Sequence, residues 1–407
     1  MKNMVVGIIG AGASGMAAAL AASEDPNVSV ILMERQTRVG RKLQATGNGR
    51  CNLSNIHAGN GGYHGQHPEF VLPAIQAFDP VKTLKWFEQL GLYTVTEPSG
   101  KVYPYSDQAN SVVDVLRLNL NRPNITLKLG FEVEKIQKNG TGFLVASREE
   151  SVVCDKLIVA CGGLAGSKLG GTMSGYKLLS KLGHKTTRLR PSLVQLKTSW
   201  DGIGALKGVR ANCHVCIYKD AELFRESSGE LQLTQQGISG PVVFEISRDV
   251  CYGAGEWTAV LDFLPEWTEE KLLAELNRRK NTQLPMEELL TGILHNRLGR
   301  VLTKTAGVKG KLFARELSCR EAEAVCRAVK ALEIALTEPL GMDSAQVTAG
   351  GVLTEHFNAH TMESCLVPGL YVCGELLDVD GDCGGYNLQW AWSSGRCAGL
   401  HAGKETT

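Results

Sequence analysis

The chain has 407 residues, 43% of them hydrophobic and 21% charged, a composition typical of a folded protein with two or three domains. Its formal net charge of +1 gives no support for a nucleic-acid or anionic-membrane partner. Twelve cysteines are scattered along it, and residues 1–3 lead directly into an apolar segment. We therefore expect reduced thiols, no secretory signal and a cytoplasmic location. The longest apolar stretch, residues 16–22, is too short to span a bilayer.

The N-terminal segment predicts a strand–loop–helix–strand unit. Residues 4–9 form an apolar run suited to a buried strand, and glycines with the spacing G-x-G-x-x-G follow at 10–15. An alanine-rich helix is expected at 16–24, and a second β-rich run at 28–33 ends at Glu34. A Rossmann-type dinucleotide-binding unit has these elements in this order.

The residue types in this unit suit an ADP group. Gly10 permits the tight turn, Gly12 lets the backbone approach a pyrophosphate, and Gly15 lets the helix pack closely on the strand. The positive end of the helix dipole favours the phosphate charge. Glu34 is placed to accept hydrogen bonds from ribose hydroxyls, and its charge would repel a 2′-phosphate, which argues against NADP in this site.

Both FAD and NAD contain the ADP group, and later segments favour FAD. A glycine-rich, cation-bearing loop at 40–52 follows the acidic strand and suits an extended cofactor. Strand patterns at 156–161 and 369–375 run into glycines, and a helix expected at 388–400 begins at a glycine-rich loop. Binding by residues from both ends of the chain is expected for FAD, which is a long molecule, and less so for NAD. A second G-x-G-x-x-G is absent from the sequence, so NADH or NADPH would bind only transiently.

Five segments carry a resemblance to a known family. They are GRK at 40–42, GNGRCN at 47–52, LTQQGISGP at 233–241, TAGGV at 348–352 and GDCGGYNLQ at 381–389. With these segments the chain resembles the aminoacetone-oxidase-like flavoproteins, a group of bacterial NAD(P)/FAD-dependent oxidoreductases that includes a clostridial 3-dehydro-bile-acid reductase. The segments are spread over almost the whole chain.

The resemblance implies an α/β fold with non-covalently bound FAD. A Rossmann-like FAD-binding domain is interrupted by an inserted β-barrel-like domain with a small helical subdomain. The expected boundaries are 1–191 and 346–407 for the FAD-binding domain, 192–265 plus 330–345 for the barrel-like domain, and 266–329 for the helical subdomain.

The pattern within the insertion changes from alternating to helical. Apolar and polar residues alternate at 209–218, as in a strand with one buried face. Helical spacing follows at 268–279, 286–305 and 318–337, where Ser318 and Glu321 have the spacing of a capping box.

We expect no metal site in the chain. Cys213 and Cys216 have the spacing of a redox or zinc motif, but residues three apart in a strand face opposite sides. His57, His64 and His67 lie near one another in sequence, in a glycine-rich segment that we interpret as a mobile, solvated loop.

The candidate cofactor residues fall into groups. The resemblance places around the ADP portion Ala13, Glu34, Arg35, Arg41, Lys42 and Val133, the last of these at the end of a strand expected at 126–133. It places toward the pyrophosphate, ribityl chain and flavin Arg50, Cys51, Asn52, Gly374, Glu375 and Asn387. The glycine-rich segments and their neighbours add Ser14, Gly49, Gly162, Asp378 and Gly385 to Gly10, Gly12 and Gly15.

The functional hypothesis is hydride transfer from NAD(P)H to FAD and then to an activated C=C of a small molecule. By resemblance, a 3-oxo unsaturated bile acid or a similar enone is the expected substrate, with Tyr386 or Tyr103 as candidate proton donor. The alternatives are an oxidase of a small amine and a flavoprotein whose FAD is structural, including an RNA-associated one. No protein partner can be inferred from the sequence.

Overall fold

A computed structural model describes residues 4–404, and the expectation about a secretory signal rests on residues 1–3, outside this range. The chain forms two compact units. Unit 1 comprises residues 1–192 and 342–407, and unit 2 comprises residues 193–341. None of the helices described is long and apolar enough to cross a membrane.

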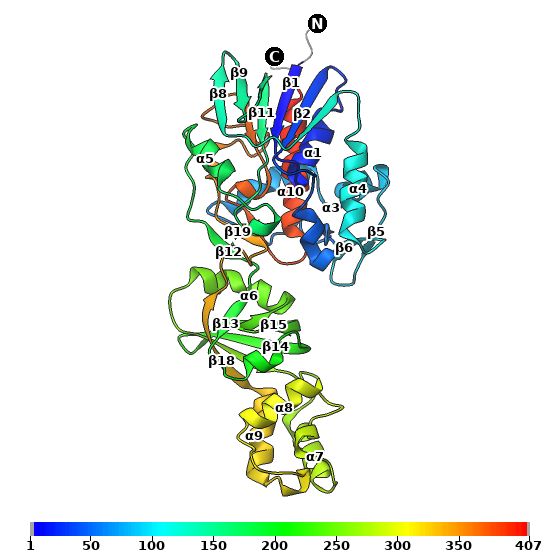
Figure 1. Ribbon diagram of the computed structural model, residues 1–407, viewed down its shortest axis with the longest axis vertical. Helices are drawn as coiled ribbons and strands as arrows, with labels where there is room; N and C mark the ends of the chain where they lie inside the picture. Colours follow the sequence, from blue (N-terminus) through cyan, green and yellow to red (C-terminus); the bar gives the residue numbers. More distant parts are fainter. Residues whose placement is uncertain (1–3, 405–407) are drawn as a thin grey trace. The chain divides into compact units, whose positions relative to one another are not determined.

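The centre of unit 1 is a five-stranded parallel sheet (Figure 1). From edge to edge its strands are β20 (Leu370–Val372), β11 (Lys156–Val159), β1 (Met4–Ile9), β2 (Val28–Glu34) and β7 (Ile125–Leu129). β1 and β11 are almost wholly apolar because parallel strands are buried on both faces. β1 from the N-terminal part of the chain and β20 from the C-terminal part thus lie within one parallel sheet, which brings the loops that follow them to the same edge.

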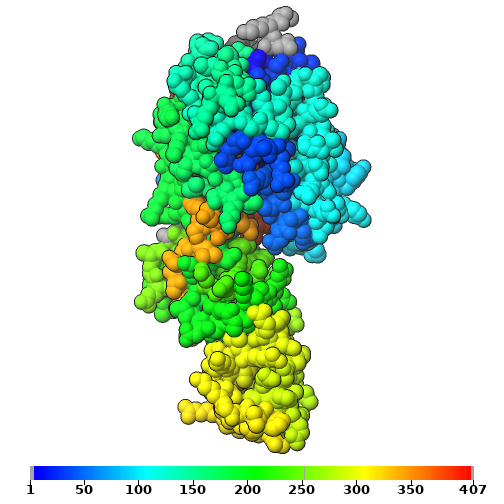
Figure 2. All heavy atoms as spheres, in the orientation of Figure 1, coloured from blue at the N-terminus to red at the C-terminus, as the bar shows by residue number. Residues whose placement is uncertain are grey.

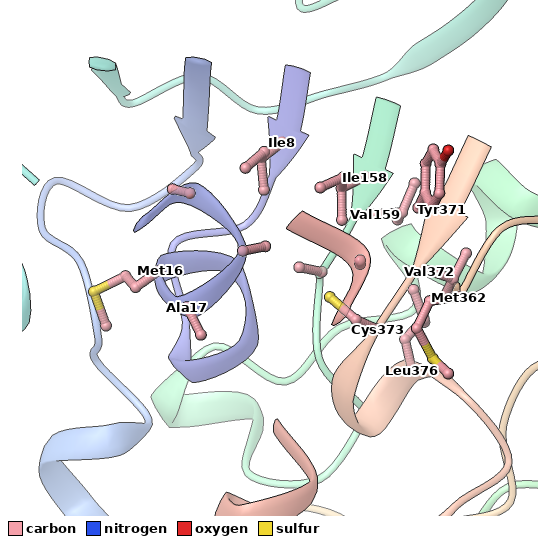
Figure 3. Packing of buried hydrophobic residues seen from close by; sticks show 14 of the residues in the cluster. Ile8, Met16, Ala17, Ile158, Val159, Met362, Tyr371, Val372, Cys373 and Leu376 are labelled. Carbon is pink, nitrogen blue, oxygen red and sulfur yellow. The ribbon is translucent and has the colours of Figure 1, made fainter. Parts of the chain in front are cut away.

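Two helices from opposite ends of the chain pack together in unit 1. They are α1 (Ala13–Ala22) and α10 (Tyr386–Ala402). A Cβ on Gly395 would lie 2.3 Å from the Ser14 carbonyl oxygen, and a Cβ on Gly399 would lie 2.3 Å from that of Ala18. The glycines therefore let the two backbones touch. Figure 3 shows part of the hydrophobic core of unit 1, with Met16 and Ala17 on α1, Ile8 on β1 and Val159 on β11.

Smaller elements complete unit 1. The remaining strands of this unit form small antiparallel sheets. Two of these sheets have three strands each, in the orders β8 (Lys135–Asn139), β9 (Gly142–Ala146), β10 (Ser151–Cys154) and β3 (Ser54–Asn55), β6 (Lys101–Pro104), β5 (Thr94–Thr96). Two others are pairs, β4 (Tyr63–His64) with β21 (Asp380–Gly381) and β12 (Arg190–Ser192) with β19 (Val347–Ala349). The other helices are α2 (Leu72–Ala77), α3 (Pro80–Gln89), α4 (Ala109–Asn119) and α5 (Ser174–Ser180).

Unit 2 contains a closed barrel with its own hydrophobic core. Around the barrel the strands are β13 (Leu196–Thr198), β16 (Gly237–Ser239), β15 (Glu222–Leu233), β14 (Arg210–Lys219), β17 (Trp257–Asp262) and β18 (Leu332–Pro339). The helices are α6 (Pro241–Tyr252), α7 (Glu269–Lys280), α8 (Asn296–Thr305) and α9 (Cys319–Lys330). The last three pack against one another, yellow in Figure 2, and their buried residues belong to the same hydrophobic core as those of the barrel. The predicted fold class, a Rossmann-like domain with a barrel-like insertion and a helical part, is confirmed.

Several predicted elements are wrong in extent. The strand expected at 126–133 ends at Leu129, and Val133 lies in an irregular segment. The helix expected at 286–305 starts only at Asn296, because Gly292 has a left-handed φ of +82° that interrupts a helix. α6 was not predicted from the sequence.

The helix expected at 318–337 ends at Lys330 and is followed by strand β18. Its predicted start is confirmed, because Ser318 and Glu321 form the capping box. Beyond Lys330, buried residues alternate with exposed ones, and pairing with β17 supplies the backbone hydrogen bonds that a helix would otherwise make. Pro339 therefore ends a strand rather than a helix.

The contact between α1 and α10 predicts a stability effect. Gly399→Ala should lower the free energy of unfolding by about 1–3 kcal/mol, because the added methyl group would force the two backbones apart. Urea unfolding of the variant and the wild type measures this difference. Gly59→Ala is the control, since a Cβ there meets no atom within 4 Å. Equal stability of Gly399→Ala and the wild type would contradict the packing described.

Candidate dinucleotide-binding site

The glycine loop (residues 10–15) joins β1 to α1. Gly10 has a φ of +101°, and its N–H donates to the Met33 carbonyl oxygen at 2.7 Å. A Cβ on Gly15 would lie 1.8 Å from the Gly10 carbonyl oxygen, so a larger residue would push the start of α1 away from the loop. A Cβ on Gly12 would meet no atom within 4 Å. The backbone at Gly12 therefore has open space beside it, as a bound pyrophosphate requires.

Glu34 is the last residue of β2, and its side chain binds the backbone of the glycine loop. Its Oε2 accepts a hydrogen bond from the Ala11 N–H, and its Oε1 accepts one from the Gln36 N–H, both at 2.8 Å. The Phe131 N–H donates to the Glu34 carbonyl oxygen at 2.9 Å, so the segment leading to Val133 begins beside this residue. A carboxylate oxygen accepts more than one hydrogen bond, so these contacts leave acceptor capacity for ribose hydroxyls.

Arg35 and Arg41, expected around the ADP portion, both have protein partners. The Arg35 Nη2 donates to the Gly170 carbonyl oxygen at 2.8 Å. The Arg41 Nη1 donates to the Gln36 side-chain oxygen at 2.9 Å. Both arginines are therefore held close to the end of β2, where Glu34 lies.

Lys42 and Glu375 meet although 333 residues separate them. The Lys42 Nζ lies 2.7 and 2.9 Å from the two carboxylate oxygens of Glu375. The Thr348 N–H donates to the same carboxylate at 2.9 Å, and a Cβ on Gly163 would lie 2.6 Å from it. This ion pair joins the basic loop (residues 40–52) to the C-terminal loop (residues 374–387) beside the end of β11.

Arg50 is held by protein groups of the opposite charge. Its Nε lies 2.5 Å from Asp107 Oδ1, and its Nη2 lies 3.2 Å from Glu97 Oε1. Its guanidinium also lies 4.0 Å from the centre of the Tyr103 ring. The hydrogen bond to Asp107 is the main cause of the raised pKa of Arg50. The assignment of Arg50 to the pyrophosphate stays a prediction.

Cys51 and Asn52 end the basic loop. Cys51 has a left-handed φ of +61° and is fully buried, and burial raises its thiol pKa to about 12, so the thiol stays protonated at neutral pH. The Asn52 Oδ1 is buried and has no hydrogen-bond partner among the described residues. Burying an acceptor without a partner costs free energy. A hydrogen-bond donor of a bound cofactor would satisfy it, so this atom fits the expected ligand.

The C-terminal loop lies against the start of α1. A Cβ on Gly374 would lie 2.5 Å from Ser14 Oγ, and the Gly374 N–H donates to Ser394 Oγ at 3.0 Å. The Asn387 Oδ1 accepts from the Gly381 N–H at 2.8 Å, and its Nδ2 donates to the Gly381 carbonyl oxygen at 2.7 Å. Asn387 thus shapes the loop through both ends of its amide.

The remaining predicted cofactor residues lie around these loops. Gly385 is the N-cap residue of α10 and has a φ of +104°, and a Cβ on it would lie 3.0 Å from Asn52 Oδ1. Gly49 and Gly162 also have left-handed φ values and open space at Cβ. Asp378 is buried, and its Oδ2 accepts from the Gln66 N–H at 3.2 Å.

The two candidate proton donors differ in their surroundings. Tyr386 is half-buried at the start of α10, and burial, followed by the nearby charge of Asp382, raises its pKa. Tyr103 is 8% exposed, and Arg50 covers one face of its ring. Burial is also the main cause of the raised pKa of Tyr103.

His64 and Asp382 form a contact that the sequence did not predict. The His64 Nε2 lies 2.7 Å from Asp382 Oδ1, and β4, which contains His64, pairs with β21. His64 therefore lies in a strand, where a loop was expected. A Cβ on Gly62 would lie 2.6 Å from the Tyr386 ring and 2.9 Å from Asp382, so the pair lies close to the candidate donor. No sequence pattern links residues this far apart.

Comparisons with known proteins agree with this architecture. The chain is 39% identical over 98% of both chains to a 3-dehydro-bile acid delta(4,6)-reductase of Clostridium scindens. It is 32% identical over 95% of both chains to a ribosomal RNA dihydrouridine synthase of Escherichia coli K12. Among solved structures, it shares the fold of a 3-ketosteroid delta1-dehydrogenase of Sterolibacterium denitrificans, with a TM-score of 0.52, 12% identity, and 98% and 99% coverage of the two chains.

The fold and the relatives together define the protein as a Rossmann-fold oxidoreductase. It belongs to the HI0933-like family, because the family's Rossmann-domain model matches residues 4–401. The resemblance found in the sequence is thereby confirmed.

The open space at Gly12 predicts a selective effect on the cofactor. Gly12→Ala should weaken FAD binding at least about tenfold, because the methyl group would occupy the space a pyrophosphate needs. The unfolding free energy of the cofactor-free variant should stay within about 0.5 kcal/mol of the wild type. Fluorescence titration of cofactor-free protein with FAD measures the affinity, with Gly59→Ala as control. Unchanged affinity would place the pyrophosphate elsewhere.

Proposed function

We propose that the protein is an FAD-dependent reductase that adds two hydrogen atoms to a C=C conjugated to a carbonyl group, with NAD(P)H as the electron donor. The reactions for which two relatives are named support this proposal. A 3-dehydro-bile acid with unsaturation at positions 4 and 6 contains an enone, and the ring of uridine contains a C=C conjugated to a carbonyl group. Two relatives with different substrates are thus named for the same chemical change.

The arrangement in unit 1 supports FAD as the cofactor. Gly12 has the open space a pyrophosphate needs, Glu34 has acceptor capacity for ribose hydroxyls, and the buried Asn52 Oδ1 lacks a donor. These features lie on loops from both ends of the chain, joined by Lys42 and Glu375. When bound, FAD would accept a hydride from NAD(P)H and pass it to the substrate.

A side chain beside the substrate would supply the proton that completes the reduction. Hydride added to the β-carbon of an enone leaves negative charge on the carbonyl oxygen and α-carbon, which a nearby acid neutralises. We propose Tyr386 for this role ahead of Tyr103, because Tyr386 is more exposed and Arg50 covers one face of Tyr103. Burial keeps the Tyr386 phenol protonated by raising its pKa.

A small-molecule enone is the favoured substrate class, since the closer of the two relatives acts on a bile acid. Reduction of uridine in ribosomal RNA is a second candidate, favoured by the relative in Escherichia coli K12. The formal net charge of +1 supplies no overall attraction to RNA, which is why this substrate ranks second.

Product analysis distinguishes the substrates. Purified protein is incubated anaerobically with NADPH or NADH carrying deuterium at the transferred position, and separately with a 3-oxo-4,6-diene steroid or with ribosomal RNA. The account predicts a steroid product with deuterium on a carbon of the former double bond. Labelled dihydrouridine with no steroid product would instead assign the RNA reaction. Hydrogen peroxide produced only with a small amine would replace both with an oxidase.

The proposed proton donor predicts a specific loss. Tyr386→Phe should lower kcat by at least about 100-fold, the usual contribution of a positioned acid. Tyr105→Phe, which changes a tyrosine that is 79% exposed, is the matched control. Because the pKa of Tyr386 is raised, wild-type kcat should fall only above the ordinary phenol pKa of about 10, and this alkaline limb should vanish in Tyr386→Phe. Full activity of both Tyr386→Phe and Tyr103→Phe would exclude the two tyrosines.

A further inference from the structure

Three side chains of the types that bind metal ions in proteins lie together on the outer surface of the barrel in unit 2. In β14 the residues Cys213, Val215 and Ile217 are buried within the barrel core. Side chains alternate along a strand, so His214 and Cys216 lie together on the opposite face. Glu226 of β15 is the residue directly across the ladder from Cys216, so its side chain lies on the same face.

The ligand atoms of these residues have the spacing of a tetrahedral site. The His214 Nε2 lies 3.4 Å from Cys216 Sγ and 3.6 Å from Glu226 Oε2. All three ligand atoms lie within 4.8 Å of one another. Ligands around tetrahedral zinc are separated by roughly 3.4–3.6 Å when the metal–ligand distances are about 2.0–2.3 Å. An ion could therefore contact all three atoms with only small side-chain movements.

A hydrogen bond to Ser228 fixes the orientation of the His214 ring. The His214 Nδ1 lies 2.7 Å from Ser228 Oγ, the hydroxyl of the residue paired with His214 across the ladder. When this nitrogen carries the proton and donates to Ser228, the lone pair of Nε2 points toward Cys216 and Glu226. Metal-binding histidines commonly have such a hydrogen bond on their second nitrogen.

The carboxylate of Asp262, on the neighbouring strand β17, is held by other partners. Asp262 pairs with His214 from β17, but its Oδ2 binds the Lys330 Nζ at 2.6 Å and its Oδ1 accepts from the Leu264 N–H at 2.8 Å. The site therefore has one nitrogen, one sulfur and one oxygen ligand, with the carboxylate side chain 63% exposed. Mixed imidazole, thiolate and carboxylate ligands suit zinc, whose three-ligand sites leave the fourth position to water.

We propose that His214, Cys216 and Glu226 bind one Zn²⁺ ion, with Ser228 orienting the histidine and a water molecule as the fourth ligand. The ion would tie β14 to β15 at the outside of the barrel. This site differs from the Cys213–Cys216 motif considered from the sequence, and it replaces the expectation that the chain has no metal site. It lies in unit 2 and does not depend on the proposed reductase activity.

Zinc titration of the full chain tests the site. The FAD-containing protein is freed of metal with a chelator, kept reduced without added thiols, and titrated with ZnCl₂ in a calorimeter. Wild type should bind one Zn²⁺ per chain that His214→Ala and Cys216→Ser do not bind. Cys319→Ser removes an exposed thiol of the same unit and should bind zinc like the wild type. Ser228→Ala should bind roughly 10–100-fold more weakly.

Cobalt gives a second, spectroscopic readout. Co²⁺ in a tetrahedral site with a thiolate absorbs in the red, beyond the bands of oxidised flavin, and this absorption should be absent in Cys216→Ser. Because the side chains lie on the outer face, the metal-free variants should melt at the wild-type temperature. Should either ligand variant fail to fold, Glu226→Gln and Ser228→Ala provide the comparison. Failure of the wild type to bind zinc, or equal binding by Cys216→Ser, would overturn the proposal.

Discussion

Helices α1 and α10 pack with their backbones in contact, and the candidate cofactor site depends on this contact. Gly395 and Gly399 leave no side chain between the helices, so the middle of α10 lies directly against the first half of α1. Gly374, which follows β20, also lies against Ser14, so the C-terminal loop borders the glycine loop. The ion pair between Lys42 and Glu375 joins the same parts of the chain from another side. A ligand held at the glycine loop would therefore meet residues from both ends of the sequence.

The sequence predicted the parts of this arrangement that follow from local pattern. The spacing of Gly10, Gly12 and Gly15 between a strand and a helix corresponds to the observed loop, because its steric demands act over a few residues. The capping box at Ser318 is equally local. In contrast, the segment after Lys330 has helical propensity but forms β18, because pairing with β17 is a long-range effect.

Side-chain partners were harder to predict than positions. Arg50 and Asn387 lie in the loops that the sequence singled out, but their charged and polar groups already bind Asp107 and Gly381. The pair of His64 and Asp382 had no sequence signal at all, since 318 residues separate them. The proposed zinc site illustrates the same limit. The spacing of Cys213 and Cys216 suggested a different motif. The strand register places Glu226 opposite Cys216, so the thiol and the carboxylate lie beside His214, and this register cannot be read from the sequence.

In the proposed reaction, electrons pass from NAD(P)H through FAD to a conjugated C=C. The most direct measurement is the visible absorption of the purified protein under anaerobic conditions, first with NADPH or NADH and then with a 3-oxo-4,6-diene steroid. The account predicts that the flavin bands bleach with the nicotinamide and return when the steroid is added. A flavin that stays oxidised with both nicotinamides, or purified protein that takes up no flavin even when FAD is supplied, would contradict it.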